Sequence, residues 1–148
     1  MLARIQKSMR DKDQGFTLIE LLVVMIIIGI LAAIAIPVFL NQRTRAVDSS
    51  MKSDARTVAS EIETKFVDTQ AYYTAPAANP FVYGTPSTTV NLSTGNLAAV
   101  TLNTAGTAFC VAVTRATGAQ PGSQAAWVYV SSEGGLLAAP TVACPATF

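Results

Sequence analysis

Few residues of this 148-residue chain are of the types that perform chemistry. The sequence has no histidine, no glycine-rich phosphate loop and no pair of carboxylates outside an expected helix. Cys110 and Cys144 lie far from any further cysteine or histidine that would complete a metal site. We therefore predict no catalytic residue, no metal and no cofactor. We interpret the two cysteines as one disulfide, with two free thiols as the alternative.

Glu20 is the acid in the most unusual position, because it directly precedes twenty residues without a charge, Leu21–Leu40. As a helix, this segment would measure about 30 Å, the thickness of the hydrocarbon core of a bilayer. Fourteen of its residues are Leu, Ile, Val or Phe, so they favour insertion by at most roughly 4 to 8 kcal/mol, less the effects of Gly29 and Pro37. We predict a membrane-spanning helix here. Taken alone, Glu20 would simply be an acid at the membrane edge, where a carboxylate costs less than at the centre.

The neighbours of Glu20 suggest a more specific role. They form the sequence Gly15-Phe16-Thr17-Leu18-Ile19-Glu20-Leu21-Leu22-Val23-Val24. This stretch resembles the N-terminal signature of type IV pilins and their relatives, in which a short polar leader ends at a glycine. The resemblance implies that a prepilin peptidase cuts between Gly15 and Phe16 and methylates the new amine of Phe16. An ordinary secretory signal is instead cut beyond its apolar segment; a generic signal-anchor is the alternative.

The resemblance also implies an assembly role for Glu20. Cleavage after Gly15 would create a positive amine on Phe16, four residues before Glu20 on the same helical face. In the family, this acid is thought to neutralise the amine of a neighbouring subunit in the filament core. A buried ion without a partner costs several kcal/mol, so this pairing would fix the register between subunits more than it would add strength.

Residues 1–15 are expected to form the leader that the peptidase removes. The leader carries four basic residues and two acids, but four basic residues also follow the span. The positive-inside rule therefore does not decide the orientation. The resemblance places the cut on the cytoplasmic face, and a disulfide requires an oxidising exterior. We expect the bulk of the chain to lie outside the cytoplasmic membrane, held by a single pass.

Gly29 and Pro37 lie within the predicted filament-core helix, residues 16–40, and have two interpretations. Both residue types are common in transmembrane helices and need no special role. Alternatively, Pro37 removes a backbone donor and clashes with the preceding turn, so that the stretch between them unwinds easily. The resemblance implies that such melting occurs in filaments and gives them flexibility.

Beyond Leu40, apolar residues recur every three or four positions, which predicts an amphipathic continuation of the helix over residues 41–70. The stripe consists of Val47, Met51, Ala55, Val58, Ile62 and Phe66. We expect it to pack on a sheet. The charges on the other faces, including the i to i+4 pairs Asp48–Lys52 and Glu61–Lys65, are interpreted as solvating the helix.

Residues 71–148 are expected to contain a loop, an antiparallel sheet and a C-terminal region closed by the disulfide. Prolines and glycines after residue 73 predict the loop, which we expect four aromatic residues to anchor on the core: Tyr72, Tyr73, Phe81 and Tyr83. Trp127 is interpreted as a core or rim residue. Strand patterns occur at Thr88–Leu92, Ala98–Leu102, Ala108–Arg115 and Ala125–Ser131. The fold class is therefore α+β, a long N-terminal helix packed on a small antiparallel sheet, and the resemblance implies the type IV pilin fold.

The resemblance implies a structural subunit, a major pilin, in a fibre for adhesion, motility or DNA uptake. Its implied partners are copies of itself, the prepilin peptidase/methyltransferase, the inner-membrane assembly platform with its ATPases, and membrane lipid before assembly. The dispersed basic residues and a net charge of +1 predict no nucleic-acid partner. The alternative is a pseudopilin of a type II secretion system. The expected disulfide and the lack of an acidic calcium-binding cluster near the C-terminus favour the pilin.

Overall fold

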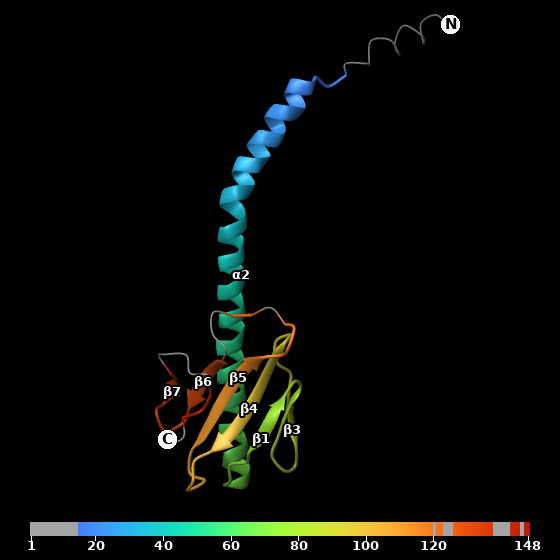
Figure 1. The fold of residues 1–148 in the computed structure, drawn as a ribbon. Helices are drawn as coiled ribbons and strands as arrows, with labels where there is room; N and C mark the ends of the chain where they lie inside the picture. The colour runs from blue at the N-terminus through green and yellow to red at the C-terminus, as the bar shows by residue number, and fades with distance from the viewer. Residues whose placement is uncertain (1–14, 120, 123–125, 138–142, 146) are drawn as a thin grey trace, which may run out of the picture. The chain divides into compact units, whose positions relative to one another are not determined.

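The computed structural model of the chain contains one long helix followed by short strands (Figure 1). It describes residues 15–119, 121–122, 126–137, 143–145 and 147–148; the predicted leader, apart from Gly15, and Ala125 of the last predicted strand lie outside this set. The helix is α2, Leu18–Thr69. The described strands are β1 Ala75–Ala78, β2 Phe81–Tyr83, β3 Thr88–Val90, β4 Asn96–Leu102, β5 Phe109–Arg115, β6 Ala126–Val130 and β7 Gly135–Leu136. The chain divides after Leu40 into two compact units, which are described separately.

The ends of α2 agree closely with the sequence prediction. The helix begins two residues later than the predicted Phe16 and ends at the predicted Thr69. Gln70 adopts a left-handed conformation with φ of 53°, and its backbone N–H donates to the carbonyl of Phe66 at 2.7 Å. A left-handed residue after the last turn is a common helix terminator. Its side-chain amide also lies within hydrogen-bonding distance of the carbonyls of Phe66 and Val67.

In the second unit, the second half of α2 packs on a five-stranded antiparallel sheet in the order β1-β4-β5-β6-β7 (Figure 1). The predicted stripe is confirmed at its centre, since Met51, Ala55, Val58 and Ile62 are fully buried. β4 and β5 pair along their full lengths, from Asn96 opposite Arg115 to Leu102 opposite Phe109. The apolar stripe of α2 and one face of the sheet thus bury each other.

The second face of the sheet is covered as well. On β5, Cys110 is as fully buried as its neighbours Phe109 and Val111, whereas a strand with one solvated face would alternate. Cys110 packs with Val128 and Val130, and three residues of the C-terminal region lie on this cluster: Leu137, Cys144 and Phe148. The expected disulfide joins Cys110 to Cys144, with a Cα–Cα distance of 5.9 Å. A closed loop of this size stabilises a fold by roughly 3 to 4 kcal/mol.

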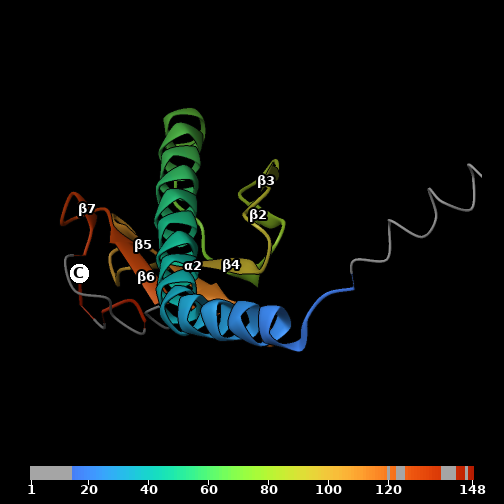
Figure 2. The same cartoon turned by 90° about the horizontal axis from the view of Figure 1, so that it is seen from above.

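The predicted loop after α2 is only partly a loop. It contains β1, an edge strand paired with β4, and β2, which forms a separate two-stranded sheet with β3. Proline is tolerated in an edge strand, which explains how Pro76 lies within β1. Figure 2 shows the β2–β3 hairpin and β7 on opposite sides of α2.

The aromatic anchors of this segment are confirmed. Tyr72 stacks on Phe66 of α2 with a centroid distance of 4.3 Å and lies 5.1 Å from the ring of Phe109. The hydroxyl of Tyr83 accepts a 2.9 Å hydrogen bond from the backbone N–H of Tyr73. These contacts place the start of the segment on the core.

The interpretation of the helix charges as solvated was wrong for Asp48 and Lys65, which are only 7% and 9% exposed. Asp48 accepts a hydrogen bond from the indole N–H of Trp127 at 3.3 Å. Lys52 places its ammonium 3.9 Å from the centre of the Trp127 ring, a cation–π arrangement. Trp127 was predicted to be a core or rim residue; it lies at the rim, because it is half-buried and contacts these two helix residues.

Asp54 is a third buried charge on α2, only 8% exposed. Its carboxylate accepts hydrogen bonds from the backbone N–H and the hydroxyl of Ser93, at 3.0 and 3.1 Å, and from the side-chain amide of Asn96. Asn96 is fully buried, and its amide oxygen accepts from the guanidinium of Arg115. This chain of contacts ties α2 to the start of β4 and the end of β5.

Candidate functional site

The predicted cleavage bond lies in an exposed segment at the start of the described chain. Gly15, Phe16 and Thr17 precede α2 without regular secondary structure. The side chain of Phe16 is 84% exposed, and no described atom beyond the chain neighbours of Gly15 lies within 4 Å of the place where a Cβ on Gly15 would be. Nothing in the described part of the chain therefore obstructs access to the bond between Gly15 and Phe16.

Thr17 and Glu20 form a reciprocal hydrogen-bonded pair at the N-terminus of α2. The Glu20 carboxylate accepts from the backbone N–H of Thr17 at 2.9 Å and from its hydroxyl at 2.8 Å. The hydroxyl oxygen of Thr17 in turn lies 3.3 Å from the backbone N–H of Glu20. This is a capping box, in which the first residue before a helix and its third helical residue satisfy each other's donors. It explains why the helix begins at Leu18.

The sequence contains the signal for this cap, a Thr followed three residues later by a Glu, but the sequence interpretation of Glu20 considered only a partner on another subunit. Both contacts with Thr17 use the same oxygen, Oε2. In the described part of the chain, the other oxygen, Oε1, has no hydrogen-bond partner. The cap therefore orients the carboxylate while leaving one oxygen able to accept from outside the chain.

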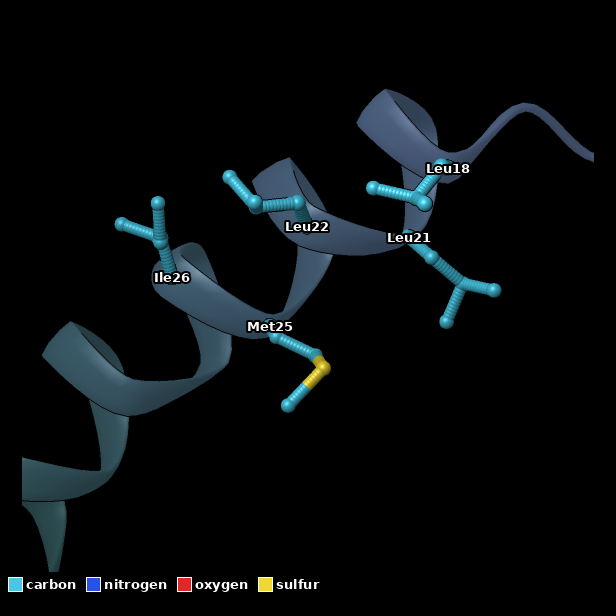
Figure 3. A pocket seen from close by; sticks show the side chains of 5 residues that line it. All are labelled: Leu18, Leu21, Leu22, Met25 and Ile26. Atoms are coloured by element: carbon cyan, nitrogen blue, oxygen red, sulfur yellow. The ribbon is translucent and has the colours of Figure 1, made fainter.

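The surface that follows is apolar and uncovered within its unit. From Leu18 to Leu40, every residue is exposed except Ala32, which is half-buried. A shallow apolar hollow on this surface is lined by Leu18, Leu21, Leu22, Met25 and Ile26, whose side chains are drawn in Figure 3. An apolar patch of this extent marks a surface that binds other apolar groups. Among the described helices, α2 is long and apolar enough to cross a membrane, with a mean hydropathy of 3.1 in its most apolar window.

Gly29 and Pro37 both lie inside α2, which is continuous through them. Apart from its chain neighbours and the adjacent backbone of the helix, no described atom lies within 4 Å of the position where a Cβ on Gly29 would be. The predicted site residues thus fall into three separate places. Gly15, Phe16 and Glu20 meet at the start of α2, Gly29 and Pro37 lie further along the same helix, and the cysteines join in the second unit.

A comparison with family models identifies the site formed by Gly15, Phe16 and Glu20 at the start of α2. A model described as the prokaryotic N-terminal methylation motif matches residues 10–36. The start of the chain carries this methylation motif. It includes the Gly15–Phe16 bond, the capping pair and most of the apolar surface.

Curated relatives match about two fifths of the chain. The type IV major fimbrial protein FimA of Dichelobacter nodosus is 47% identical over 60 residues, which are 40% of this chain and 38% of FimA. The type IV major pilin protein PilA of Myxococcus xanthus (strain DK1622) is 41% identical over 61 residues, 41% of this chain and 28% of PilA. The type II secretion system core protein G of Pseudomonas aeruginosa is 36% identical over 63 residues, 43% of this chain and 44% of that protein.

The chain is therefore similar to type IV pilins and to a type II secretion core protein over 60 to 63 residues. The match spans less than half the length of these relatives. No solved structure matches the chain significantly. The α+β arrangement of one long helix on a small antiparallel sheet is consistent with the pilin fold that the sequence resemblance implies.

Proposed function

We propose that the chain is a pilin subunit that is cut between Gly15 and Phe16, methylated on Phe16 and assembled through the first half of α2 into an extracellular fibre. The observation that carries the proposal is the methylation motif lying directly on an uncovered apolar helix. A helix of this kind needs cover from outside its own chain. Lipid supplies that cover before assembly, and the helices of other copies supply it afterwards.

Cleavage supplies the chemical change that accompanies the transfer from membrane to fibre. In the intact chain, the nitrogen of Phe16 is a neutral amide; after the cut, it is an amine that stays positive when methylated. Oε1 of Glu20, which the cap leaves without a partner in the described part of the chain, accepts from the amine of a neighbouring copy. Lipid tails and neighbouring helices are about equally apolar, so packing and polar pairs decide whether such helices associate. Gly29 and Pro37 supply the positions at which α2 unwinds when the fibre is stretched.

The proposed partners follow from this cycle. They are copies of the chain, a prepilin peptidase that also methylates, and an inner-membrane platform with its ATPases. The subunit begins as a single-pass protein of the cytoplasmic membrane with its sheet outside, where the Cys110–Cys144 bond is stable. The fibre serves adhesion, motility or DNA uptake.

Mass spectrometry of fibres sheared from cells tests this proposal. The subunit should begin with an N-methylated Phe16, and electron microscopy should show fibres that are lost when the gene is deleted. A Glu20→Ala variant should still be cut and inserted but should yield few fibres. Recovery of fibres whose subunits still begin at Met1 would contradict the processing step, and normal fibres from the variant would contradict the role of Glu20.

A second function is supported by the similarity to the type II secretion core protein G. In that case, the chain would be a pseudopilin assembled beneath the outer surface to move secreted proteins. The same shearing experiment separates the two, because a pseudopilin would be processed at Gly15 but absent from surface fibres, and its deletion would stop secretion.

A further inference from the structure

The part of α2 that follows the uncharged segment displays bases and no acids. Among residues 41–60, the exposed or half-exposed charged residues are Arg43, Arg45, Lys52 and Arg56. The same stretch contains two acids, Asp48 and Asp54, but these are only 7% and 8% exposed. Burial of the acids against the sheet unit therefore leaves this part of the helix surface positive, although the sequence contains both signs.

The fold uses Asp48, the nearest acid to Arg45 along the helix, for another contact. Residues three apart on a helix are neighbours, so the sequence allows these two to form an ion pair. Asp48 instead accepts from the indole N–H of Trp127, and a Cβ on Gly122 would lie 2.5 Å from its Oδ1, so the loop before β6 packs closely on it. In the described part of the chain, the side chains of Arg43 and Arg45 form no ion pair or hydrogen bond. Both guanidinium groups are thus left for a partner outside the chain.

The positions of these two arginines match the headgroup layer of a bilayer. That layer is about 5 to 7 Å thick on each side of the hydrocarbon core. The uncharged segment ends at Leu40, where α2 is continuous, and the helical rise places Arg43 and Arg45 about 4.5 and 7.5 Å beyond it. Lys52 and Arg56 follow Leu40 by about 18 and 24 Å, beyond the roughly 10 Å over which salt screens a surface charge. The first two bases are therefore the ones that meet lipid phosphates.

We propose that Arg43 and Arg45 bind the phosphates of anionic phospholipids, in the leaflet that faces away from the cytoplasm, before the subunit is assembled. The inference rests on the membrane stage of the proposed function. A guanidinium group donates two parallel hydrogen bonds to a phosphate, and it keeps its charge in that setting. A basic residue beside an anionic leaflet strengthens binding about fivefold.

The geometry of the two side chains favours lipid over a free anion as the partner. Residues two apart leave a helix about 200° apart, on nearly opposite sides, so one small ion cannot contact both guanidinium groups. A leaflet surrounds the helix and offers each arginine its own headgroup. The apolar surface that precedes them lacks cover within its unit, and lipid tails supply that cover as well. These contacts hold the subunit at a fixed depth and break when it enters the fibre.

Spin-labelled lipids test the contact in the full chain, reconstituted in bilayers of phosphatidylcholine. Electron paramagnetic resonance separates lipids slowed by the protein from free lipids, and so measures the preference for phosphatidylglycerol over phosphatidylcholine. R43Q/R45Q should lower this preference about twofold, because a fivefold effect at each arginine is averaged over all lipids around the helix. R43K/R45K should keep most of the preference, since lysine retains the charge. High salt should remove the difference between R43Q/R45Q and the unaltered chain.

Arg56→Gln is the matched control, because it removes an exposed arginine that lies beyond the headgroup layer, and it should leave the preference unchanged. The basic residues of the predicted leader contribute equally to every variant, so the differences between variants report Arg43 and Arg45. The number of slowed phosphatidylcholine molecules should be the same throughout, which shows that each variant has inserted. Replacing chloride with inorganic phosphate at equal ionic strength should have no effect.

An unchanged preference in R43Q/R45Q, or an equal loss in Arg56→Gln, would overturn the assignment to these two arginines and leave the proposed function standing. Loss of the preference in inorganic phosphate would mean that the arginines bind a free anion, and would overturn lipid as the partner. An unaltered chain that slows neither lipid would not span the bilayer. That result would instead overturn the membrane stage of the proposed function.

Discussion

The two halves of α2 have the same backbone and opposite surroundings. Before Leu40, leucine, isoleucine and valine side chains point outward without cover from their own unit, and Ile28 is 59% exposed. After Asn41, the apolar residues form a narrow stripe, and Ile62 at its centre is fully buried by the sheet. Helix geometry alone therefore does not decide what such a helix does. The apolar side chains of the first half lack cover from their own unit, whereas the second half is stabilised by packing on its own sheet.

Substitution of one isoleucine in each half of α2 tests this difference most directly and should give the largest effect. Ile62→Ala should lower the free energy of unfolding of the sheet unit by about 2 to 5 kcal/mol, because it leaves a cavity in a packed core. Ile28→Ala should change it by less than about 0.5 kcal/mol. Urea unfolding of the full chain in detergent micelles, followed by the near-ultraviolet circular dichroism of Trp127, measures both. Equal effects would show that the first half is part of the same cooperative unit.

On the second half of α2, replacing a buried acid should lower the free energy of unfolding, whereas replacing an exposed acid should not. Asp54→Ala removes the acceptor for Ser93 and Asn96 and should lower the free energy of unfolding by about 1 to 3 kcal/mol, since their buried donors lose a partner. Asp68→Ala, at an exposed position, is the matched control and should change it by less than about 0.5 kcal/mol. The same urea titrations apply. If Asp54→Ala left the free energy of unfolding unchanged, water would have to replace the carboxylate as the acceptor for Ser93 and Asn96.

Removing the Thr17–Glu20 cap should have a smaller effect on stability, confined to the first turn of α2. Thr17→Val keeps the shape but removes the hydroxyl, and should weaken the first turn of α2 by about 0.5 to 2 kcal/mol. Thr17→Ser keeps the hydroxyl and should preserve the turn. Amide hydrogen exchange at residues 18–21 in micelles measures the difference. Equally faster exchange in both variants would show that the Thr17 hydroxyl does not stabilise the first turn.

Alkaline pH should act on the sheet unit alone. Burial raises the pKa of the Tyr83 phenol above its ordinary value, and burial with the nearby Glu63 raises that of Tyr72. A raised pKa means that the protonated phenol stabilises the fold fully below the unfolded-state pKa of about 10, and that this stabilisation is lost as pH rises through the folded-state value. Unfolding free energies measured from pH 8 to 11 should therefore fall less steeply for Tyr83→Phe than for the unaltered chain. Parallel curves would exclude a contribution from Tyr83.

Periodicity was enough to predict α2 and the four strands from β3 to β6, because each of these elements has a regular apolar pattern. It was not enough for β1 and β2. These strands have three or four residues, β1 includes Pro76, and their pairing depends on β4 and β3 further along the chain. Local sequence carries little of that information.

The buried charges could not be predicted from the helix pattern for a related reason. Asp48 and Asp54 occupy positions beside the apolar stripe, and their partners, Trp127 and Ser93, lie 79 and 39 residues further along the chain. At the candidate site, the motif identified Gly15, Phe16 and Glu20. The Thr17–Glu20 cap needed only four adjacent residues and was predictable; the motif drew attention to an external partner instead.

The bond between Cys110 and Cys144 also orders the steps by which the sheet is completed. Cys144 follows its partner by 34 residues, so this bond cannot form until that length of chain has been made. Until then, Cys110, Val128 and Val130 lack part of the cover that the C-terminal residues supply. A chain that stops short of Cys144 keeps a free thiol at Cys110 and an open apolar face on the sheet. The disulfide is therefore a covalent mark that the chain has been completed through Cys144.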